Sequence, residues 1–240
     1  MKKARYTVLL LDADGTLYDF EKSQKNALLA ACRQAGFLAP NTDFSKMLDC
    51  YSCINQSWWK KLERGECTKP QLQLGRFHDF FVEMGLQYDA SAFNDMYMEE
   101  LGNGSFLLPY AEEVCRELAK SCKLYIVTNG VSRTQRRRIG ASPLAELFQG
   151  LFVSEEAGAP KPEKRYFEYV FRHLGNLDLR DILLVGDSLT SDMQGAENAG
   201  LDSCWLNPSR LPRPAKPSVT YMIHDLRQLL DVALYGKQPS

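Results

Sequence analysis

Short runs of apolar residues recur along the chain, without the polar alternation that a half-exposed strand shows. Continuous runs of this kind are typical of strands in a parallel sheet that is covered on both faces. The runs cover residues 6–11, 124–127, 151–153, 182–185 and 203–206. Amphipathic segments with helical spacing lie at residues 111–121, 132–139, 164–174 and 193–199. This alternation of strand and helix predicts an α/β fold with a doubly wound, Rossmann-like parallel sheet.

The interval from residue 18 to residue 106 breaks this rhythm, because it holds no convincing strand. Helices are predicted there at residues 21–35, 44–64, 69–84 and 90–101, with glycine-containing turns between them. We therefore predict a helical module, residues 18–106, inserted into an α/β core of residues 1–17 and 107–240. A proline-rich stretch at residues 208–217 is expected to be a surface loop.

Charge and hydropathy argue against several classes of partner. The 240 residues carry a formal net charge of -1, so no global basic field attracts nucleic acid. No run of about 18 apolar residues occurs, so we expect no membrane-spanning helix. The apolar run at residues 8–11 is too short for a signal peptide, which favours a cytoplasmic protein. The arginines at 136–138 are interpreted as a solvated helix face.

The seven cysteines follow no regular framework, which is typical of reduced thiols. Cys50 and Cys53 form a single C-x-x-C pair, and no second pair of ligands follows at zinc spacing. We therefore interpret these two residues as buried, small apolar side chains rather than metal ligands.

The strongest chemical signal is the pair Asp12 and Asp14, directly after the first apolar run, followed by Gly15 and Thr16. Ligands of open α/β sheets bind at the carboxyl ends of the strands. Two carboxylates at such an end can face one site if the chain turns, and Gly15 permits a turn. Paired carboxylates attract a divalent cation, and a site with only oxygen ligands suits Mg²⁺.

Three further groups of polar residues follow other apolar runs. Asp187 and Asp192 come after the run 182–185, and Thr128-Asn129-Gly130 comes after the run 124–127, at the start of a helix. A helix N-terminus offers N–H groups and a positive dipole, which suit phosphate. Lys161 stands between two prolines that restrict its backbone, and could be fixed against phosphate and carboxylate. Its alternative interpretation is an ordinary surface lysine.

Together these groups resemble the motifs of the haloacid dehalogenase-like hydrolase superfamily, over essentially the whole chain. Asp12 and Asp14 match the first motif, Thr128 the second, Lys161 the third, and Asp187 with Asp192 the fourth. The helical module resembles the first type of cap domain in that superfamily.

The resemblance implies a role for each of these residues. Asp12 would be the nucleophile that forms an aspartyl-phosphate, and Asp14 would protonate the leaving oxygen and then activate water. Mg²⁺ would be held by Asp12, the backbone carbonyl of Asp14 and Asp187, with Asp192 acting directly or through water. The phosphoryl oxygens would be held by Thr128, Asn129, Gly130 and Lys161. Dehalogenases of the superfamily need neither the metal nor the second acid, so Asp14 and the acidic fourth motif favour a phosphatase.

The substrate must be selected by residues outside these motifs, because the motifs contact only the phosphoryl group. Trp58-Trp59, Arg64 and Arg76-Phe77 make the chain resemble the pyrimidine 5′-nucleotidase subgroup, which acts on UMP, dUMP and dTMP. The tryptophans could stack on a base or pack within the helical module. Arg76 could contact substrate or form a salt bridge between the cap and the core.

Other activities stay open at this point. They are a phosphatase for a small organic phosphate such as phosphoglycolate, a mutase of the β-phosphoglucomutase kind, and a phospho-accepting signalling receiver. A receiver has no helical insertion after its first strand, which disfavours it. We expect a small phosphate monoester as the partner and a monomer or dimer as the assembly.

Overall fold

The apolar runs form one parallel sheet of six strands, in the order β3-β2-β1-β4-β5-β6. The computed structural model describes residues 4–39 and 42–238. The strands are β1 (Val8–Leu11), β2 (Lys123–Thr128), β3 (Phe148–Val153), β4 (Ile182–Gly186), β5 (Asp202–Leu206) and β6 (Tyr221–Ile223). The first three strands run outward from β1 to the edge strand β3, and the chain then crosses over to β4, which lies on the other side of β1. The strand order therefore reverses between β1 and β4. In open α/β sheets, such a reversal point is where ligands bind.

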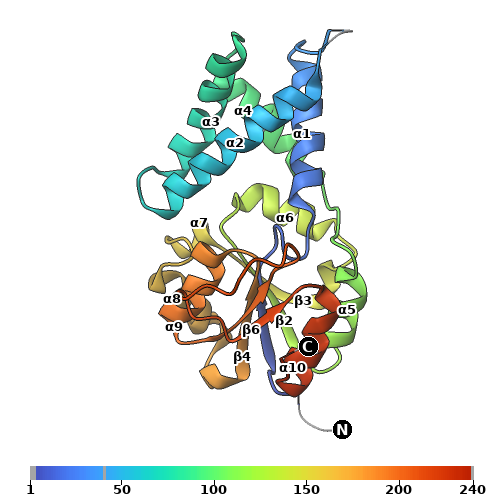
Figure 1. The fold of residues 1–240 in the computed structure, drawn as a ribbon, viewed down its shortest axis with the longest axis vertical. Helices are drawn as coiled ribbons and strands as arrows, with labels where there is room; N and C mark the ends of the chain where they lie inside the picture. Colours follow the sequence, from blue (N-terminus) through green and yellow to red (C-terminus); the bar gives the residue numbers. More distant parts are fainter. Residues whose placement is uncertain (1–3, 40–41, 239–240) are drawn as a thin grey trace. The chain divides into compact units, whose positions relative to one another are not determined.

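Helices cover both faces of the sheet (Figure 1). The helices of this α/β part are α5 (Ala111–Leu118), α6 (Ser132–Gly140), α7 (Ser154–Ala157), α8 (Lys164–Leu174), α9 (Gln194–Ala199) and α10 (Leu229–Tyr235). Leu9 and Leu11 of β1 pack in one buried cluster with α5 and α10, whereas Val8 and Leu10 pack in another with α8 and α9. Successive side chains of a strand point to opposite faces, which explains why β1 is apolar at every position.

The predicted doubly wound α/β fold is confirmed, and the five predicted strands all form. Two elements at the C-terminal end were not predicted, namely β6 and α10. The helix predicted from residue 193 is preceded by a π-helical turn, Leu189–Met193, so the chain is already helical two residues after Asp187. The proline-rich stretch 208–217 forms neither helix nor strand, as predicted.

Residues 21–104 form a compact unit of their own, and the chain up to Phe20 and from Ser105 onward forms the other. The helices of the first of these units are α1 (Phe20–Gln34), α2 (Phe44–Glu63), α3 (Lys69–Met84) and α4 (Ala90–Gly102). We call it the helical unit, and the other the α/β unit.

Local sequence signals start and stop the helices of the helical unit. Asp43 and Asp89 accept hydrogen bonds from the first turns of α2 and α4, and Thr68 forms a capping box with Gln71 before α3. Gly85 ends α3 with φ of 64°, a left-handed conformation that glycine adopts without strain. The interior of the unit is aromatic, and Tyr51 stacks on Phe77 with ring centroids 5.3 Å apart.

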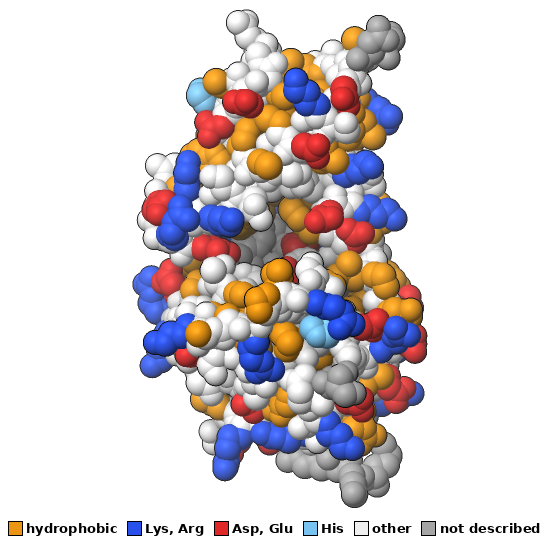
Figure 2. Space-filling model, viewed as in Figure 1, with side chains coloured by type: hydrophobic (Ala, Val, Ile, Leu, Met, Phe, Trp, Pro, Cys, Tyr) orange, Lys and Arg blue, Asp and Glu red, His pale blue; other side chains and the backbone are white. Residues whose placement is uncertain are grey.

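Helix length and surface charge are two further features of the described residues. No helix among the described residues is long and apolar enough to cross a membrane. On the face shown in Figure 2, Lys and Arg side chains are interspersed with Asp and Glu rather than gathered in one basic area.

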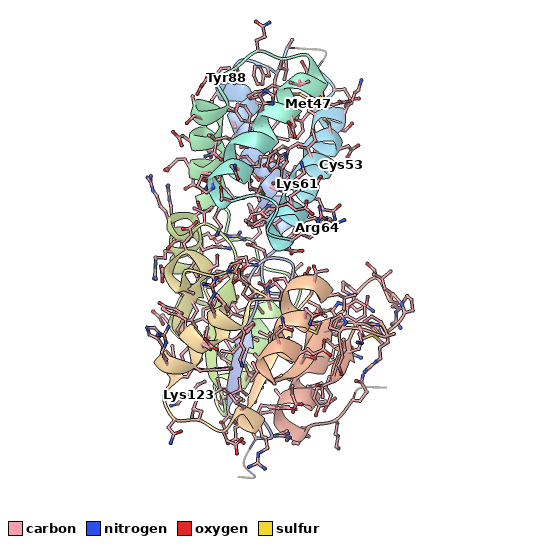
Figure 3. All side chains as sticks on the ribbon, turned by 90° about the vertical axis from the view of Figure 1, so that its left-hand side faces the viewer. Met47, Cys53, Lys61, Arg64, Tyr88 and Lys123 are labelled. Atoms are coloured by element: carbon pink, nitrogen blue, oxygen red, sulfur yellow. The ribbon has the colours of Figure 1, made fainter. Side chains whose placement is uncertain are left out.

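The cysteines are free thiols, as predicted, but the interpretation of Cys53 as buried is wrong. Cys53 lies exposed on α2, as Figure 3 shows, and Cys50 is partly buried. The two are three residues apart, so they sit nearly one turn apart on α2. Within the described residues, neither cysteine belongs to a group of side chains that could hold a metal.

Candidate active site

Asp12 lies immediately after β1, where the chain makes a tight turn. The backbone N–H groups of Leu17 and Tyr18 both donate to the Ala13 carbonyl, and the Gly15 N–H donates to the Tyr18 carbonyl. Gly15 has φ of 84°, and a Cβ there would lie 2.5 Å from Asp187 Oδ2. Glycine is therefore needed at this position for conformation and for space.

The carboxyl ends of β1 and β4 are neighbours, so Asp12 and Asp187 meet. Leu11 pairs with Val185, and the Asp12 N–H donates to the Val185 carbonyl at 2.9 Å. Thr16, which is fully buried, lies with its Oγ1 3.3 Å from both Asp12 Oδ2 and Asp187 Oδ1. Its hydroxyl has one hydrogen, so it can donate to one of these carboxylates at a time.

The structure brings three of the predicted metal ligands together. Carboxylate oxygens of Asp12, Asp187 and Asp192 all lie within 4.8 Å of one another. Asp192 also accepts from the Ser188 N–H at 3.2 Å, and a Cβ on Gly186 would lie 2.2 Å from Asp192 Oδ2. The glycine at the end of β4 thus leaves the space that Asp192 fills.

Lys161 is buried among these carboxylates rather than exposed on the surface. Its Nζ lies 2.6 Å from Asp12 Oδ1, 2.6 Å from Asp192 Oδ1 and 3.0 Å from the Val127 carbonyl oxygen. These partners match the three N–H donors of an ammonium group. Lys161 does not directly follow β3, because α7 intervenes, yet it reaches the same edge of the sheet.

The charges in the site perturb one another strongly. Burial raises the pKa of Asp12 well above its usual range; Asp192 and Asp187 add to the effect and Lys161 opposes it. Burial, followed by the charge of Asp192, raises the pKa of Asp187 to about 7. Burial alone would lower the pKa of Lys161, but Asp12 and Asp192 outweigh it and raise that pKa, so the side chain stays charged. Three carboxylates against one ammonium leave an excess of negative charge that a divalent cation would balance.

Thr128, at the end of β2, is buried with its hydroxyl fixed by two donors. The Gly130 N–H and Gln135 Nε2 each donate to Thr128 Oγ1 at 3.0 Å. A hydroxyl oxygen has two lone pairs, so both are used and the hydroxyl hydrogen is left to donate. This arrangement suits a group that binds a phosphoryl oxygen.

The Asn129 side chain contacts the backbone of Lys161 rather than its ammonium group. Asn129 Oδ1 accepts from the Lys161 N–H at 2.8 Å, and Asn129 Nδ2 donates to the Lys161 carbonyl at 2.9 Å. The side-chain amide therefore holds the loop that carries Lys161. Position 130 needs a glycine for space, because a Cβ there would lie 2.2 Å from Gln135 Nε2.

Asp14 is held by two residues of α6 that the sequence analysis did not select. Its Oδ1 lies 2.5 Å from Arg138 Nη1, and its Oδ2 lies 2.6 Å from Gln135 Nε2. The interpretation of residues 136–138 as a solvated face is therefore wrong for Arg138, which is 1% exposed. It holds for Arg136, whose exposed guanidinium pairs with Glu156. The spacing of Gln135 and Arg138, three residues apart on one helix face, was the available signal.

Arg76 belongs to the helical unit and is buried in it. Its Nη1 donates to Asn55 Oδ1 at 3.1 Å and its Nη2 to Asn94 Oδ1 at 3.0 Å. Both partners are side-chain amides of the same unit. The Trp58 indole donates to Asp79 at 2.9 Å and fills the space beside Gly75, which favours packing over base stacking for this residue.

Comparison with known proteins identifies the family of the chain. The family described as haloacid dehalogenase-like hydrolase matches residues 6–200. The HAD-hydrolase YfnB of Bacillus subtilis (strain 168) is 36% identical over 228 residues, which are 95% of each protein. The solved structure of YfnB bound to magnesium has a TM-score of 0.88 and covers 95% of this chain and 98% of that one.

Two further relatives are named as pyrimidine 5′-nucleotidases. PynA of Streptococcus pneumoniae is 31% identical over 94% of each protein. YjjG of Escherichia coli (strain K12) is 31% identical over 92% of this chain and 96% of its own length. With the family match extending across most of the α/β unit and the whole helical unit, the chain belongs to the haloacid dehalogenase-like hydrolases.

Proposed function

We propose that this hydrolase acts on phosphate monoesters through an aspartyl-phosphate formed on Asp12. The observation that carries the proposal is the cluster of Asp12, Asp187 and Asp192 carboxylates beside the buried Lys161, with Asp14 two residues from Asp12. A bare carboxylate would be repelled by a phosphate monoester, which carries about two negative charges near neutral pH. The group fits an enzyme that must overcome this repulsion before Asp12 can attack.

The donor set fits Mg²⁺, because it consists of clustered carboxylate oxygens with an excess of negative charge. Asp12, Asp187 and the backbone carbonyl of Asp14 would hold the ion, with Asp192 bound directly or through water. When bound, the ion supplies positive charge that screens Asp12 from the phosphoryl group and stabilises the transition state. In support, the related YfnB has been solved bound to magnesium.

In the first step, an Asp12 carboxylate oxygen attacks phosphorus and the bond from phosphorus to the ester oxygen breaks. The Asp14 carboxyl donates its proton to the departing alkoxide oxygen, which leaves as an alcohol. The Thr128 hydroxyl donates to a phosphoryl oxygen, and the Lys161 ammonium offsets the negative charge of Asp12 and Asp192. Asn129 contributes by holding the Lys161 backbone in place.

In the second step, water attacks phosphorus and the bond between phosphorus and Asp12 breaks. Asp14, now a carboxylate, accepts the proton of that water, and inorganic phosphate leaves. The cycle returns Asp12 as a carboxylate and Asp14 as a carboxyl group, and its net reaction is hydrolysis of the ester.

We further propose that the substrates are pyrimidine nucleoside 5′-monophosphates, with the helical unit acting as the cap that selects them. The proposal is supported by the names of PynA and YjjG, which match this chain over both units. Arg76, which is buried in the helical unit beside Asn55 and Asn94, is a further candidate for substrate selection.

The test is a comparison of phosphate release from UMP, dTMP, phosphoglycolate and β-glucose 1-phosphate in Mg²⁺, with and without excess chelator. We expect UMP and dTMP to be hydrolysed fastest and the chelator to stop the reaction. A higher rate with phosphoglycolate would contradict the nucleotidase proposal alone. Conversion of glucose 1-phosphate to its 6-phosphate without phosphate release would indicate a mutase.

The variant Asp12→Asn tests the nucleophile separately from the substrate. Removing a nucleophile costs activity by orders of magnitude, about 10⁴-fold or more in enzymes of known mechanism. We expect such a loss with an unchanged circular dichroism spectrum, and no loss in Asp231→Asn, a control on an exposed residue of α10. Substantial turnover by Asp12→Asn would remove Asp12 from this role.

A further inference from the structure

We propose that Gln135 and Arg138 of α6 are positioning residues that hold the Asp14 carboxylate in the orientation needed for its proton transfers. The inference rests on the proposed function, because it assigns Asp14 the role of acid and base. Neither residue belongs to the motifs that the sequence analysis selected.

Each of the two residues donates a hydrogen bond to a different carboxylate oxygen of Asp14. Arg138 Nη1 lies 2.5 Å from Oδ1, and Gln135 Nε2 lies 2.6 Å from Oδ2. Two bonds to different oxygens fix the rotation of a carboxylate, whereas one bond leaves it free to turn. Each oxygen keeps a second lone pair, and the side chain is 26% exposed, so Asp14 can still exchange a proton.

Gln135 also ties Asp14 to the phosphoryl-binding group. The same Nε2 atom donates to Thr128 Oγ1 at 3.0 Å, so both of its hydrogens are used. The amide thus sets the distance between Asp14 and the Thr128 hydroxyl. Gly130 supports this contact, because a Cβ there would lie 2.2 Å from the Gln135 amide nitrogen.

The burial of Arg138 is explained by its ion pair with Asp14. Its side chain is 1% exposed, and its Nε and Nη2 atoms find no hydrogen-bond partner among the described residues. Its side-chain partners among the described residues are the Asp14 carboxylate and the ring of Tyr18, whose centroid lies 5.2 Å from Cζ. Burying a guanidinium with unsatisfied donors is costly, so a purely structural position would favour an apolar residue.

The loss of activity on misplacing Asp14 should depend on the leaving group. An alkoxide such as the 5′-oxygen of a nucleotide needs a proton from Asp14 as it leaves, whereas 4-nitrophenolate leaves without one. Since kcat/KM reports the steps up to departure of the leaving group, misplacing Asp14 should lower kcat/KM for the alkyl ester far more than for the aryl ester.

The experiment measures kcat and KM of Arg138→Met and Gln135→Met with UMP and with 4-nitrophenyl phosphate. A misplaced catalytic group costs about 100-fold, so we expect kcat/KM for UMP to fall by about that factor. For 4-nitrophenyl phosphate we expect less than about a threefold change in kcat/KM, but slow steady-state turnover after a burst of nitrophenolate, because the second step still needs Asp14 as base. Arg138→Lys, which keeps the charge, should recover part of the loss with UMP.

Two controls separate positioning from general damage. Arg136→Met removes an exposed arginine of the same helix and should leave both substrates unaffected. In an Asp14→Asn background, Arg138→Met should add little to the loss with UMP, because the two residues act as one unit.

Equal losses with both esters, or losses that multiply in the Asp14→Asn background, would overturn the positioning role. The same conclusion would follow if Gln135→Met, which keeps the volume of the side chain, folded and retained full kcat/KM for UMP. If the wild-type protein released no phosphate from either ester, the proposed function itself would fail, and this inference with it.

Discussion

At the scale of single residues, Lys161 is the side chain on which the geometry of the site depends most. Lys161 carries a positive charge although the residue is only 1% exposed, and its ammonium group contacts two carboxylates and a backbone carbonyl. An ammonium group transferred from water to such a place is stable only if every donor is satisfied and the charge is balanced. Both conditions are met here, so Lys161 and the aspartates depend on one another.

Replacing Lys161 with methionine should therefore destabilise the protein as well as inactivate it. Removing one partner of a buried ion pair costs about 3–5 kcal/mol, because the remaining charge is left uncompensated. We expect a loss of this size in urea denaturation without Mg²⁺ and a smaller loss in its presence, since the cation takes over part of the compensation.

The matched control for this variant is Lys123→Met. Lys123 stands exposed at the start of β2 (Figure 3), where a substitution changes stability by no more than about 0.5 kcal/mol. Equal effects of the two substitutions would mean that Lys161 does not balance the aspartates.

At the scale of elements, the site is built by the turns that follow parallel strands. Glycines at these strand ends leave room for side chains of the candidate site, as Gly186 at the end of β4 does for Asp192 and Gly130 after β2 does for Gln135. The π-helical turn at Leu189–Met193 then returns Asp192 to the end of the strand it has just left. Such turns are a recurring feature of functional sites.

Gly186→Ala should displace Asp192 and so weaken the site without replacing any of its polar side chains. The added Cβ would lie 2.2 Å from Asp192 Oδ2 and 2.5 Å from its Cβ, so the side chain must move. Overpacking of this kind costs about 1–3 kcal/mol. We therefore expect a lower melting temperature. We also expect the Mg²⁺ concentration that gives half-maximal activity, measured by titrating the ion in the phosphatase assay, to rise at least tenfold, which corresponds to about 1.4 kcal/mol of binding free energy.

Gly140→Ala is the matched control, because no atom lies within 4 Å of a Cβ at that position. Alanine is a better helix former than glycine by about 1 kcal/mol, so this variant should be as stable as the wild type or more so. If Gly186→Ala behaved in the same way, the close approach to Asp192 would not matter for the site.

At the scale of the whole molecule, the site should link Mg²⁺ to the stability of the α/β unit. Three clustered carboxylates, two of them buried, lie near one ammonium and repel one another when no cation is bound. A ligand that binds only the folded state stabilises it, so Mg²⁺ should raise the melting temperature.

This stabilisation should depend on pH in a defined direction. In the metal-free protein the pKa of Asp187 is raised from 3.8 to about 7. A raised pKa means that the proton stabilises the folded state, and that this contribution is lost as the pH rises from below about 4 through 7. The upward shift in melting temperature caused by Mg²⁺ should therefore be larger at pH 8 than at pH 5.5. A shift that is equal at both pH values, or that persists in Asp187→Asn, would place the ion elsewhere.

The sequence by itself determined the fold class and most of the residues of the candidate site. Continuous apolar runs predict buried parallel strands because both faces of such a strand are covered, and five strands formed where they were predicted. Polar residues directly after those runs identified Asp12, Thr128 and Asp187, because strand order brings the carboxyl ends of parallel strands to one edge. β6 escaped prediction because three residues, Tyr221–Ile223, carry too little pattern.

Only the tertiary structure decided the partners of the buried charges. A helix with three consecutive arginines looks solvated by composition, yet burial differs between Arg136 and Arg138 because the helix turns one toward Glu156 and the other toward Asp14. Likewise, no local pattern shows that Asn129 holds the backbone of a residue 32 positions away. Charge compensation acts through space and over short distances, so it follows from which side chains the packed chain brings together and not from their order in sequence.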